Sequence, residues 1–368
     1  IFGQITATMG SSYTLHTPQA FRDALRRGAT RVFHPSKAGP FFLNLPINTQ
    51  PTKVTLRLDS LPERPQPFVP YLLSDTLIKN AAALISQASQ IAIKAGGGSR
   101  KAAKALLCFA ETSGAVVVLS PGSTGVVPDD HPQNMHVGGS KGSISGNYAM
   151  QEAELVIFVG SRGVCQSDCS GIGWPKAKHV ININTDFNDV LHYNNTLALQ
   201  GDAATILEQL TQCLDKQKNK SEWLSKCLTK KKEWQAFKKE RFEAATIEDN
   251  IWGTPLLTQP QVIKIADNFA RLHGAIKFFD AGDVQANGFQ IVEDNSPEET
   301  FTDSGSSYMG FAVSALLSQA LANKGCYSIA LTGDGSFMMN PQILNGPSSA
   351  VSTPPITGND ALFSIFRV

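Results

Sequence analysis

The sequence predicts an α/β fold built on doubly wound parallel sheets. Short apolar runs typical of buried strands cover residues 90–94, 115–119, 155–160 and 179–184, and a helical stretch follows the first of them. A similar run at 327–331 leads into a glycine-containing turn. Because buried strands that alternate with helices are typical of parallel sheets covered on both faces, these observations indicate this fold class.

The first part of the chain predicts one helix, one strand and a linker. The helix covers residues 17–27, with Pro18 near its start and Gly28 as its stop. Gly39-Pro40 then turns the chain into a strand at 41–45. Proline recurs so often between residues 46 and 70 that regular elements are excluded, which predicts an extended linker and a domain boundary.

The middle of the chain carries a glycine-rich loop. A helix is expected at 77–88, and Gly96-Gly97-Gly98 follows the strand at 90–94 and opens a helix that runs through Ala110. Dinucleotide-binding loops have this form. No acidic residue closes the next strand, 115–119, where a partner for a ribose would lie. The loop therefore favours a structural role, while FAD stays an open alternative that these residues do not support.

Residues 216–241 are rich in Lys and Glu, with aromatic side chains between them. Such a stretch could be a nucleic-acid or calmodulin-type target. Its acidic residues offset the basic ones, so an amphipathic helix that links two domains is the preferred interpretation. A further helix at 259–273 leads into a strand at 276–280.

Composition excludes several classes of protein. The 32 Lys and Arg residues balance 31 Asp and Glu residues, so charge supports neither a nucleic-acid nor a membrane-surface partner. No apolar run has the length of a membrane span. The six Cys residues lack paired metal-binding spacing, which predicts reduced thiols and a cytoplasmic location.

The most informative stretch is 325–340, which contains Thr332-Gly333-Asp334-Gly335 directly after a buried strand. Ser336 is expected to cap the helix that follows. A turn of this kind aims a carboxylate and backbone amides at one point, so Asp334 could hold a divalent cation while the amides hold a diphosphate. Gly-Asp-Gly alone is equally typical of an ordinary turn.

Residues 301–322 make the interpretation specific, because this serine- and glycine-rich loop contains Met309-Gly310 and runs into a helix of small residues. Together with the Gly-Asp-Gly turn, it resembles the thiamine-diphosphate enzymes of the acetolactate synthase-like superfamily. Residues 279–285 resemble the first strand and diphosphate loop of the same domain. Residues 77–210 resemble the family's central domain, and 38–48 resemble the strand that closes its first domain.

The resemblance implies a cofactor site for thiamine diphosphate and Mg²⁺. Met309 would prop the cofactor in its bent form, and the Ser307 carbonyl, where the family usually has Gly, would hold its amino group. The metal ligands would be Asp334 and Asn359, although two prolines precede Asn359 where the family has a strand. The implied cofactor-binding residues are Gly282, Gln285, Ser307, Met309, Gly333, Gly335 and Ser336.

The resemblance also implies that the sequence is a fragment of three-domain architecture, with incomplete first and last domains. Residues 1–60 would be the remnant of the pyrimidine-binding domain plus linker, 75–212 the central domain and 250–368 the diphosphate- and metal-binding domain. The family's essential catalytic Glu would lie before Ile1, so no catalytic residue is assigned and the fragment alone is expected to be inactive. The parent would be a homodimer or homotetramer.

Three functions remain open at this point. An acetolactate synthase-like parent would cleave or join carbon–carbon bonds of 2-oxo acids, as a lyase or transferase. A trihydroxycyclohexanedione hydrolase of inositol breakdown would instead open a cyclic dione. The third alternative is a truncated, non-catalytic homologue. The residues shown do not identify the substrate.

Overall fold

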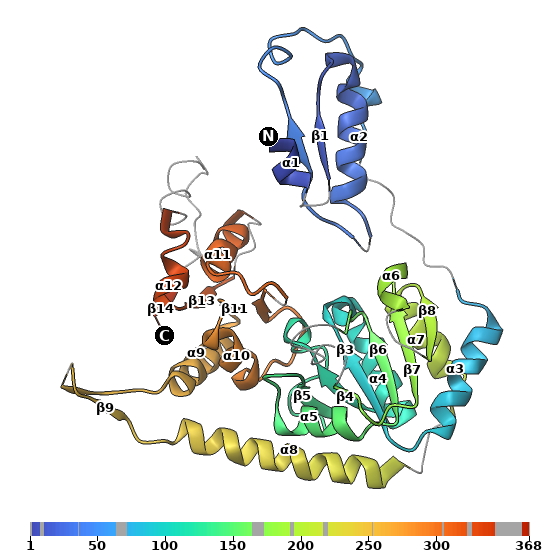
Figure 1. The fold of residues 1–368 in the computed structure, drawn as a ribbon, viewed down its shortest axis with the longest axis vertical. Helices are drawn as coiled ribbons and strands as arrows, with labels where there is room; N and C mark the ends of the chain where they lie inside the picture. The colour runs from blue at the N-terminus through green and yellow to red at the C-terminus, as the bar shows by residue number, and fades with distance from the viewer. Residues whose placement is uncertain are drawn as a thin grey trace. The chain divides into compact units, whose positions relative to one another are not determined.

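The computed structural model divides the chain into two compact units, residues 1–71 and 72–368, which are described separately (Figure 1). The first unit is small, and its two strands, β1 and β2, pair in parallel with Tyr13 opposite Leu43. The structure describes residues 2–7, 11–35, 37–63, 72–163, 173–191, 195–215, 220–251, 253–303, 305–321, 326–342 and 363–367. The elements of the first unit are α1 (Phe2–Ala7), β1 (Ser12–Thr14), η1 (Pro18–Ala20), α2 (Phe21–Val32), β2 (Phe42–Asn44) and η2 (Leu58–Ser60).

The predicted helix stop at Gly28 is wrong. Helix α2 continues through Gly28 to Val32, and the glycine is buried on its inner face. A Cβ atom at Gly28 would lie 3.0 Å from Cδ1 of Phe41. The glycine therefore lets the Phe41 ring pack directly against the helix backbone, which is a tertiary reason for glycine that the local sequence does not reveal.

The second unit contains a six-stranded sheet in which every neighbouring pair is parallel. This arrangement confirms the predicted fold class (Figure 1). In spatial order its strands are β5 (Asn134–Val137), β4 (Val116–Leu119), β3 (Ile91–Ala95), β6 (Leu155–Val159), β7 (His179–Asn184) and β8 (Thr196–Gln200).

Helices cover both faces of this sheet because its strands are apolar on both sides. Ile91 and Ile93 face a core made with α3, α4 and α7, whereas Ala92 faces a second core made with α5 and the start of α8. The helices of this part are α3 (Asp75–Gln87), η3 (Gly97–Ala102), α4 (Ala103–Ser113), η4 (Pro121–Ser123), α5 (Ile144–Glu152), α6 (Phe187–Val190), α7 (Ala203–Gln212) and α8 (Ser221–Phe242).

A separate four-stranded parallel sheet follows, in the order β12, β11, β13, β14. Helices α9 and α10 pack on one face and α11 on the other. Within the described ranges, no helix has the length and apolar composition needed to cross a membrane. The elements are β9 (Ile247–Asp249), β10 (Thr254–Leu256), α9 (Gln259–His273), β11 (Ile276–Phe279), α10 (Asp283–Ile291), β12 (Thr300–Thr302), α11 (Phe311–Leu321), β13 (Ser328–Thr332), α12 (Asp334–Phe337) and β14 (Phe363–Arg367).

Helix α8 connects the parts of the chain that form the two sheets. Near its start, Trp223 is buried and donates from Nε1 to the carbonyl oxygen of Ile91 at 3.0 Å. Near its end, Lys238 lies 3.5 Å from Glu293, just after α10. The helix was expected at 216–241, and it packs at both ends as a connector would. The domain limits of 1–60, 75–212 and 250–368 remain a prediction from the sequence.

Candidate functional site

Two glycine turns lie at one edge of the four-stranded sheet. Gly282 follows β11 and Gly333 follows β13, and these two parallel strands are neighbours, with Phe279 opposite Leu331. Gly282 has a φ of 84°, a conformation that favours glycine. A Cβ atom on either glycine would meet no atom within 4 Å, so the space beside both turns is open.

Asp280, at the end of β11, holds this edge together. Its carboxylate is fully buried and accepts hydrogen bonds from the backbone N–H groups of Ala281 and Gly310, both at 2.9 Å. It also accepts one from the N–H of Ala312 at 3.2 Å and one from the hydroxyl of Thr332 at 2.9 Å. A buried carboxylate needs such partners, and here they come from three different segments of the chain.

Met309 lies against the Gly-Asp-Gly turn. A Cβ atom at Gly335 would lie 3.1 Å from the methyl carbon of Met309. The next residue, Gly310, has a φ of 93° and packs beside the Asn340 amide. The Met-Gly pair and the turn that follows β13 are therefore in direct contact, although more than twenty residues of sequence separate them.

Ser307 and Gln285 shape the loop before Met309. Ser307 has a φ of 53°, in the left-handed region that glycine adopts most easily. Ser307 thus holds a conformation that glycine adopts easily, at the strain that a side chain adds there. Gln285 is buried, and its side-chain N–H donates to the Thr302 hydroxyl at 2.7 Å and to the Asp303 carbonyl at 2.5 Å.

Asp334 is exposed at this edge, and one of its oxygens accepts the N–H of Gly335 at 2.8 Å. The prediction that Ser336 caps the helix is wrong, because α12 begins at Asp334 and its N-cap is Gly333. Ser336 is instead buried inside this four-residue helix. The strand–turn pattern located the turn but not the first helical residue. Asn359, the second predicted metal ligand, lies outside the described residues.

Two further polar side chains belong to this part of the unit. Tyr308 is about half exposed. The pKa of its phenol is raised, mainly by burial and to a smaller extent by the nearby carboxylates of Asp303 and Asp280. It therefore keeps its proton at neutral pH and can donate a hydrogen bond. Asp283, at the start of α10, is exposed and lies 3.9 Å from the Lys141 ammonium group.

The glycine triplet after β3 has a packing explanation. A Cβ atom at Gly96 would overlap the Gly160 carbonyl, and one at Gly98 would lie 2.9 Å from the Gly160 Cα. The backbone after β6 therefore fills the space beside two of the three glycines. The guanidinium of Arg162, in the same segment, reaches toward Gly305 in the loop before Met309.

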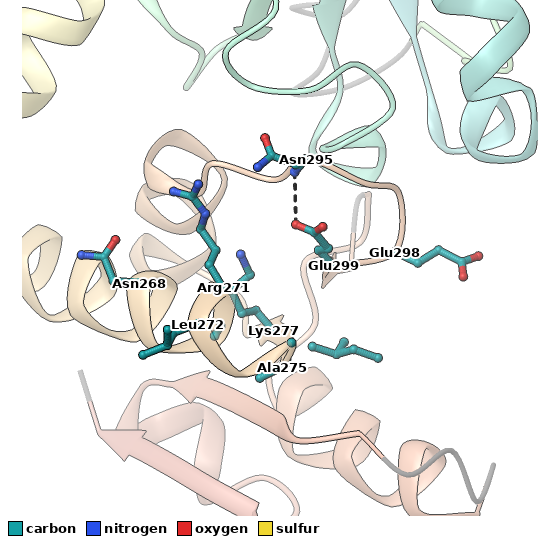
Figure 2. Close-up of a pocket in the computed structure, with 11 residues that line it drawn as sticks. Asn268, Arg271, Leu272, Ala275, Lys277, Asn295, Glu298 and Glu299 are labelled. Carbon is teal, nitrogen blue, oxygen red and sulfur yellow. Dashed lines mark hydrogen bonds between the residues drawn. The ribbon is translucent and has the colours of Figure 1, made fainter.

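A pocket of about 590 Å³ lies at the opposite, amino end of β11, between α9 and the loop before β12 (Figure 2). The ammonium group of Lys277 is buried there, 2.5 Å from Asp267 and 2.7 Å from Asp294. Burial alone would lower the pKa of Lys277, but the two carboxylates together raise it above its ordinary value. This lysine is fully engaged in structural ion pairs.

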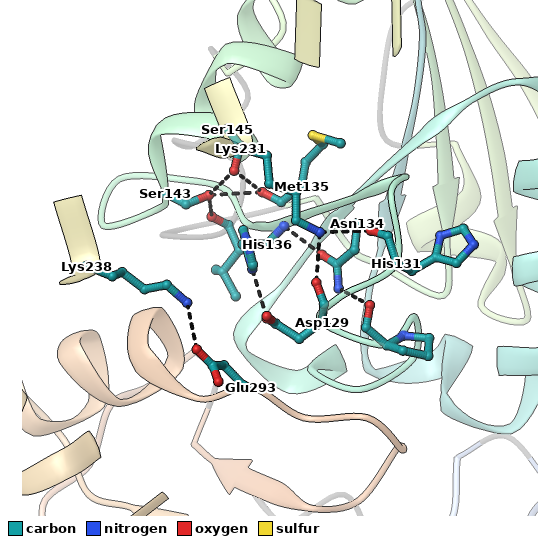
Figure 3. A network of polar contacts seen from close by, with 12 residues as sticks. Asp129, His131, Asn134, Met135, His136, Ser143, Ser145, Lys231, Lys238 and Glu293 are labelled. Carbon is teal, nitrogen blue, oxygen red and sulfur yellow. Dashed lines mark hydrogen bonds and ion pairs between the residues drawn. The ribbon is translucent and has the colours of Figure 1, made fainter. Parts of the chain in front are cut away.

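A second polar network lies where α8 crosses the loop after η4 (Figure 3). His136 is buried with a φ of 60°, and its Nδ1 lies 3.0 Å from Asp129. Burial lowers the pKa of His136, and Asp129 only partly offsets this effect. Lys231 donates to the carbonyl oxygens of Asp129 and His131, each at 2.8 Å. The network joins α8 to the central sheet.

The fold is that of an α/β protein with two glycine turns and an exposed carboxylate at the carboxyl ends of neighbouring parallel strands. Two family descriptions match the sequence, "Thiamine pyrophosphate enzyme, central domain" over residues 78–210 and "Thiamine pyrophosphate enzyme, C-terminal TPP binding domain" over residues 280–346. The chain therefore belongs to the thiamine pyrophosphate enzymes, as the sequence motifs predicted.

Curated relatives include two kinds of enzyme. The large subunit of acetolactate synthase isozyme 1 of Escherichia coli is 26% identical over 332 residues, covering 88% of this chain and 54% of that protein. The 3D-(3,5/4)-trihydroxycyclohexane-1,2-dione hydrolase of Lacticaseibacillus casei is 27% identical over 350 residues, covering 88% of this chain and 53% of that protein. The chain spans about half the length of the curated relatives it matches.

The described residues fit the diphosphate end of such a cofactor. Asp334 offers an exposed carboxylate, and open space lies beside Gly282 and Gly333 at the same edge. Carboxylate oxygens are the ligands that Mg²⁺ prefers. In the described part of the chain, no group of three or more His, Cys, Asp or Glu side chains could hold a metal. The predicted ligands Asp334 and Asn359 would contribute only one such side chain, so this finding does not test them.

The sequence interpretation missed Asp280 and Thr332. Both are buried, and both lie in stretches that the sequence analysis quoted, but neither was singled out as a site residue. One signal was available, since an aspartate directly after an apolar strand must find hydrogen-bond partners when it is buried. Which partners it finds depends on the loop before α11, whose position only the tertiary structure supplies.

Proposed function

We propose that the complete protein is a thiamine-diphosphate- and Mg²⁺-dependent enzyme that cleaves or joins a carbon–carbon bond of a 2-oxo acid, in the manner of an acetolactate synthase. The observation that carries this proposal is the contact of Met309 with the Gly-Asp-Gly turn at the open edge of the sheet. When bound there, thiamine diphosphate supplies a nucleophilic carbon and an electron sink next to the substrate carbonyl.

The proposal assigns a task to most of the predicted site residues. Asp334 holds the metal ion, together with Asn359, and the amides of Gly335 and Ser336 meet the diphosphate. Met309 supports the bend of the cofactor, and the Ser307 carbonyl accepts a hydrogen bond from the cofactor's amino group. Gly282 gives the diphosphate room beside β11, and Gln285 fixes the loop through Thr302 and Asp303.

A cyclic-dione hydrolase is the second candidate. Its support is the Lacticaseibacillus casei relative, whose 27% identity is close to the 26% of the Escherichia coli acetolactate synthase subunit. The experiment is to assay the complete protein, with thiamine diphosphate and Mg²⁺, on pyruvate and on 3D-(3,5/4)-trihydroxycyclohexane-1,2-dione. Turnover of pyruvate supports the first candidate, and turnover of the dione alone supports the second.

The third candidate is a truncated, non-catalytic homologue. We propose that the 368 residues alone do not turn over, because none of the described residues is assigned as the catalytic acid–base group. Loss of a general acid–base group typically costs about 10²–10⁴-fold in rate. Turnover by the 368-residue chain above the rate of free cofactor would overturn this proposal.

The organisation of the parent is proposed on the same basis. We retain domains at 1–60, 75–212 and 250–368, supported by the separate six- and four-stranded sheets. We also propose a homodimeric or homotetrameric parent in the cytoplasm. Four described cysteines, Cys108, Cys213, Cys227 and Cys326, carry free thiols. Sedimentation of the complete protein measures its oligomeric state, and cell fractionation its location.

A further inference from the structure

We infer that Asp280 is a positioning residue that couples Met309 to Asp334, so that neither can take its place at the edge without the other. This inference rests on the proposed function and deepens it. Asp280 belongs to neither the Met-Gly pair nor the Gly-Asp-Gly turn, and its buried carboxylate has no access to a ligand. It acts through the backbone and the hydroxyl group that it binds.

The first half of the coupling fixes Met309. One carboxylate oxygen of Asp280 accepts the N–H of Gly310, the residue directly after Met309, at 2.9 Å. The other oxygen accepts the N–H of Ala312 in the first turn of α11 at 3.2 Å. The chain therefore leaves the loop and enters α11 at a point set by Asp280, and Met309 lies immediately before that point.

The second half fixes Asp334. The Thr332 hydroxyl lies 2.9 Å from the same carboxylate and 3.2 Å from the Gly333 carbonyl, so its shorter contact is with Asp280. Thr332 is the last residue of β13, two positions before Asp334. One buried carboxylate thus binds the segments on both sides of the Met309–Gly335 contact. Hydrogen bonds to a buried charge are strong, and removing one partner leaves a buried acceptor unsatisfied at a cost in free energy.

A matched set of variants tests the coupling. Thr332→Val keeps the shape of the side chain and removes the hydroxyl, whereas Thr332→Ser keeps the hydroxyl. Thr300→Val is the control, because Thr300 lies on the edge strand β12, is equally buried and donates to the buried Asp294 at 3.0 Å. A purely structural loss at Thr332 would resemble this control.

The first measurement uses no cofactor. Amide hydrogen exchange of the complete protein should show faster exchange across residues 307–312 in Thr332→Val, and wild-type exchange in Thr332→Ser and Thr300→Val. Unchanged exchange at 307–312 in Thr332→Val overturns the coupling. If that variant does not fold, residue-resolved exchange of the wild type decides, since fast exchange of the Gly310 and Ala312 amides contradicts the hydrogen bonds to Asp280.

The second measurement is thiamine diphosphate affinity by calorimetry with Mg²⁺ present. Thr332→Val should raise Kd by about tenfold, as expected for one lost hydrogen bond to a charge, while Thr332→Ser stays within about threefold of the wild type. Equal losses in Thr332→Val and Thr300→Val overturn the inference. If the wild type binds no cofactor, the proposed function fails, and the exchange measurement still decides the coupling on its own.

Discussion

At the scale of single residues, the candidate site separates exposed carboxylates that can meet a ligand from buried ones that cannot. Asp334 is exposed at the end of β13, and the carboxylate of Asp280 is enclosed by its four donors. Asp334→Asn removes the charge of the proposed metal ligand while keeping the size of the side chain. It should weaken Mg²⁺-dependent thiamine diphosphate binding at least about tenfold, or about 1.4 kcal/mol.

Isothermal calorimetry on the complete protein measures this effect. Glu222→Gln is the control, because Glu222 is also exposed but pairs with Lys226 on α8 and belongs to no part of this edge. It should leave the affinity within about twofold, as an exposed pair contributes little. Equal affinity in Asp334→Asn and the wild type would remove Asp334 from the metal site.

Lys277 gives the largest stability prediction for a single residue. Its buried ammonium group pairs with both Asp267 and Asp294, so Lys277→Met would leave Asp294 without this cation and Asp267 with only Lys264, 3.7 Å away. The free energy of unfolding should fall by about 3–5 kcal/mol. Urea unfolding at pH 7 measures it, and Lys239→Met, which removes an exposed pair with Glu243, should change stability by less than about 0.5 kcal/mol.

The pH dependence of this ion pair follows from the raised pKa of Lys277. The contribution is complete below the unfolded pKa of 10.5 and is lost as the pH rises through the higher folded pKa. The wild type should therefore lose more stability than Lys277→Met above pH 10.5. Parallel losses in the two proteins would contradict the assignment.

At the scale of elements, Lys220 joins two helix ends to the start of α8. Its buried ammonium group donates to the carbonyl oxygens of Ile85, near the end of α3, and Ser113, at the end of α4, each at 2.9 Å. Cations near helix C-termini are stabilising because the last carbonyls lack partners within the helix. Lys220→Met should lower stability at pH 7 by about 2 kcal/mol.

The pH dependence of the Lys220 contribution has a sign opposite to that of Lys277. Burial lowers the pKa of Lys220 to about 8, so the unfolded chain binds more protons between pH 8 and 10.5. Wild-type stability should rise relative to Lys220→Met across that window. Lys226→Met, an exposed change on the same helix, should not alter this slope, and a slope shared by Lys220→Met would contradict the prediction.

The elements also show what the sequence could predict. The strand at 179–184 and the helix at 259–273 were found because each is bounded by a clear change in pattern. Strand β5 was missed because Asn134 and His136 interrupt its apolar pattern, and both are buried through hydrogen bonds or ion pairs that form only in the fold. Met309 and Asp334 were predicted as site residues from motifs, whereas the hydrogen bonds of Asp280 became visible only in the tertiary structure.

At the scale of the second unit, contacts between the two sheets come mainly from loops. The N–H of Asp129 donates to the Asp294 carbonyl at 3.1 Å, and the Arg100 guanidinium lies 4.6 Å from the centre of the Phe301 ring. Gly125 packs directly on the backbone of Ser296. Because these contacts join segments on both sides of α8, the two sheets should unfold together in the wild type.

Gly125→Ala tests this cooperativity. Gly125 has a φ of 79°, and a Cβ atom there would overlap the Ser296 carbonyl, whose backbone cannot move aside cheaply. Gly274→Ala is the matched control, because Gly274 has a φ of 62° but open space around it. Each variant adds left-handed strain of about 1–2 kcal/mol, and only Gly125→Ala also forces the loops apart.

Urea unfolding, monitored by hydrogen exchange, is the measurement. The four-stranded sheet should open before the six-stranded sheet in Gly125→Ala, and Gly274→Ala should show a single transition. A single transition in both would mean that α8 and the remaining contacts are sufficient to keep the sheets in one cooperative unit.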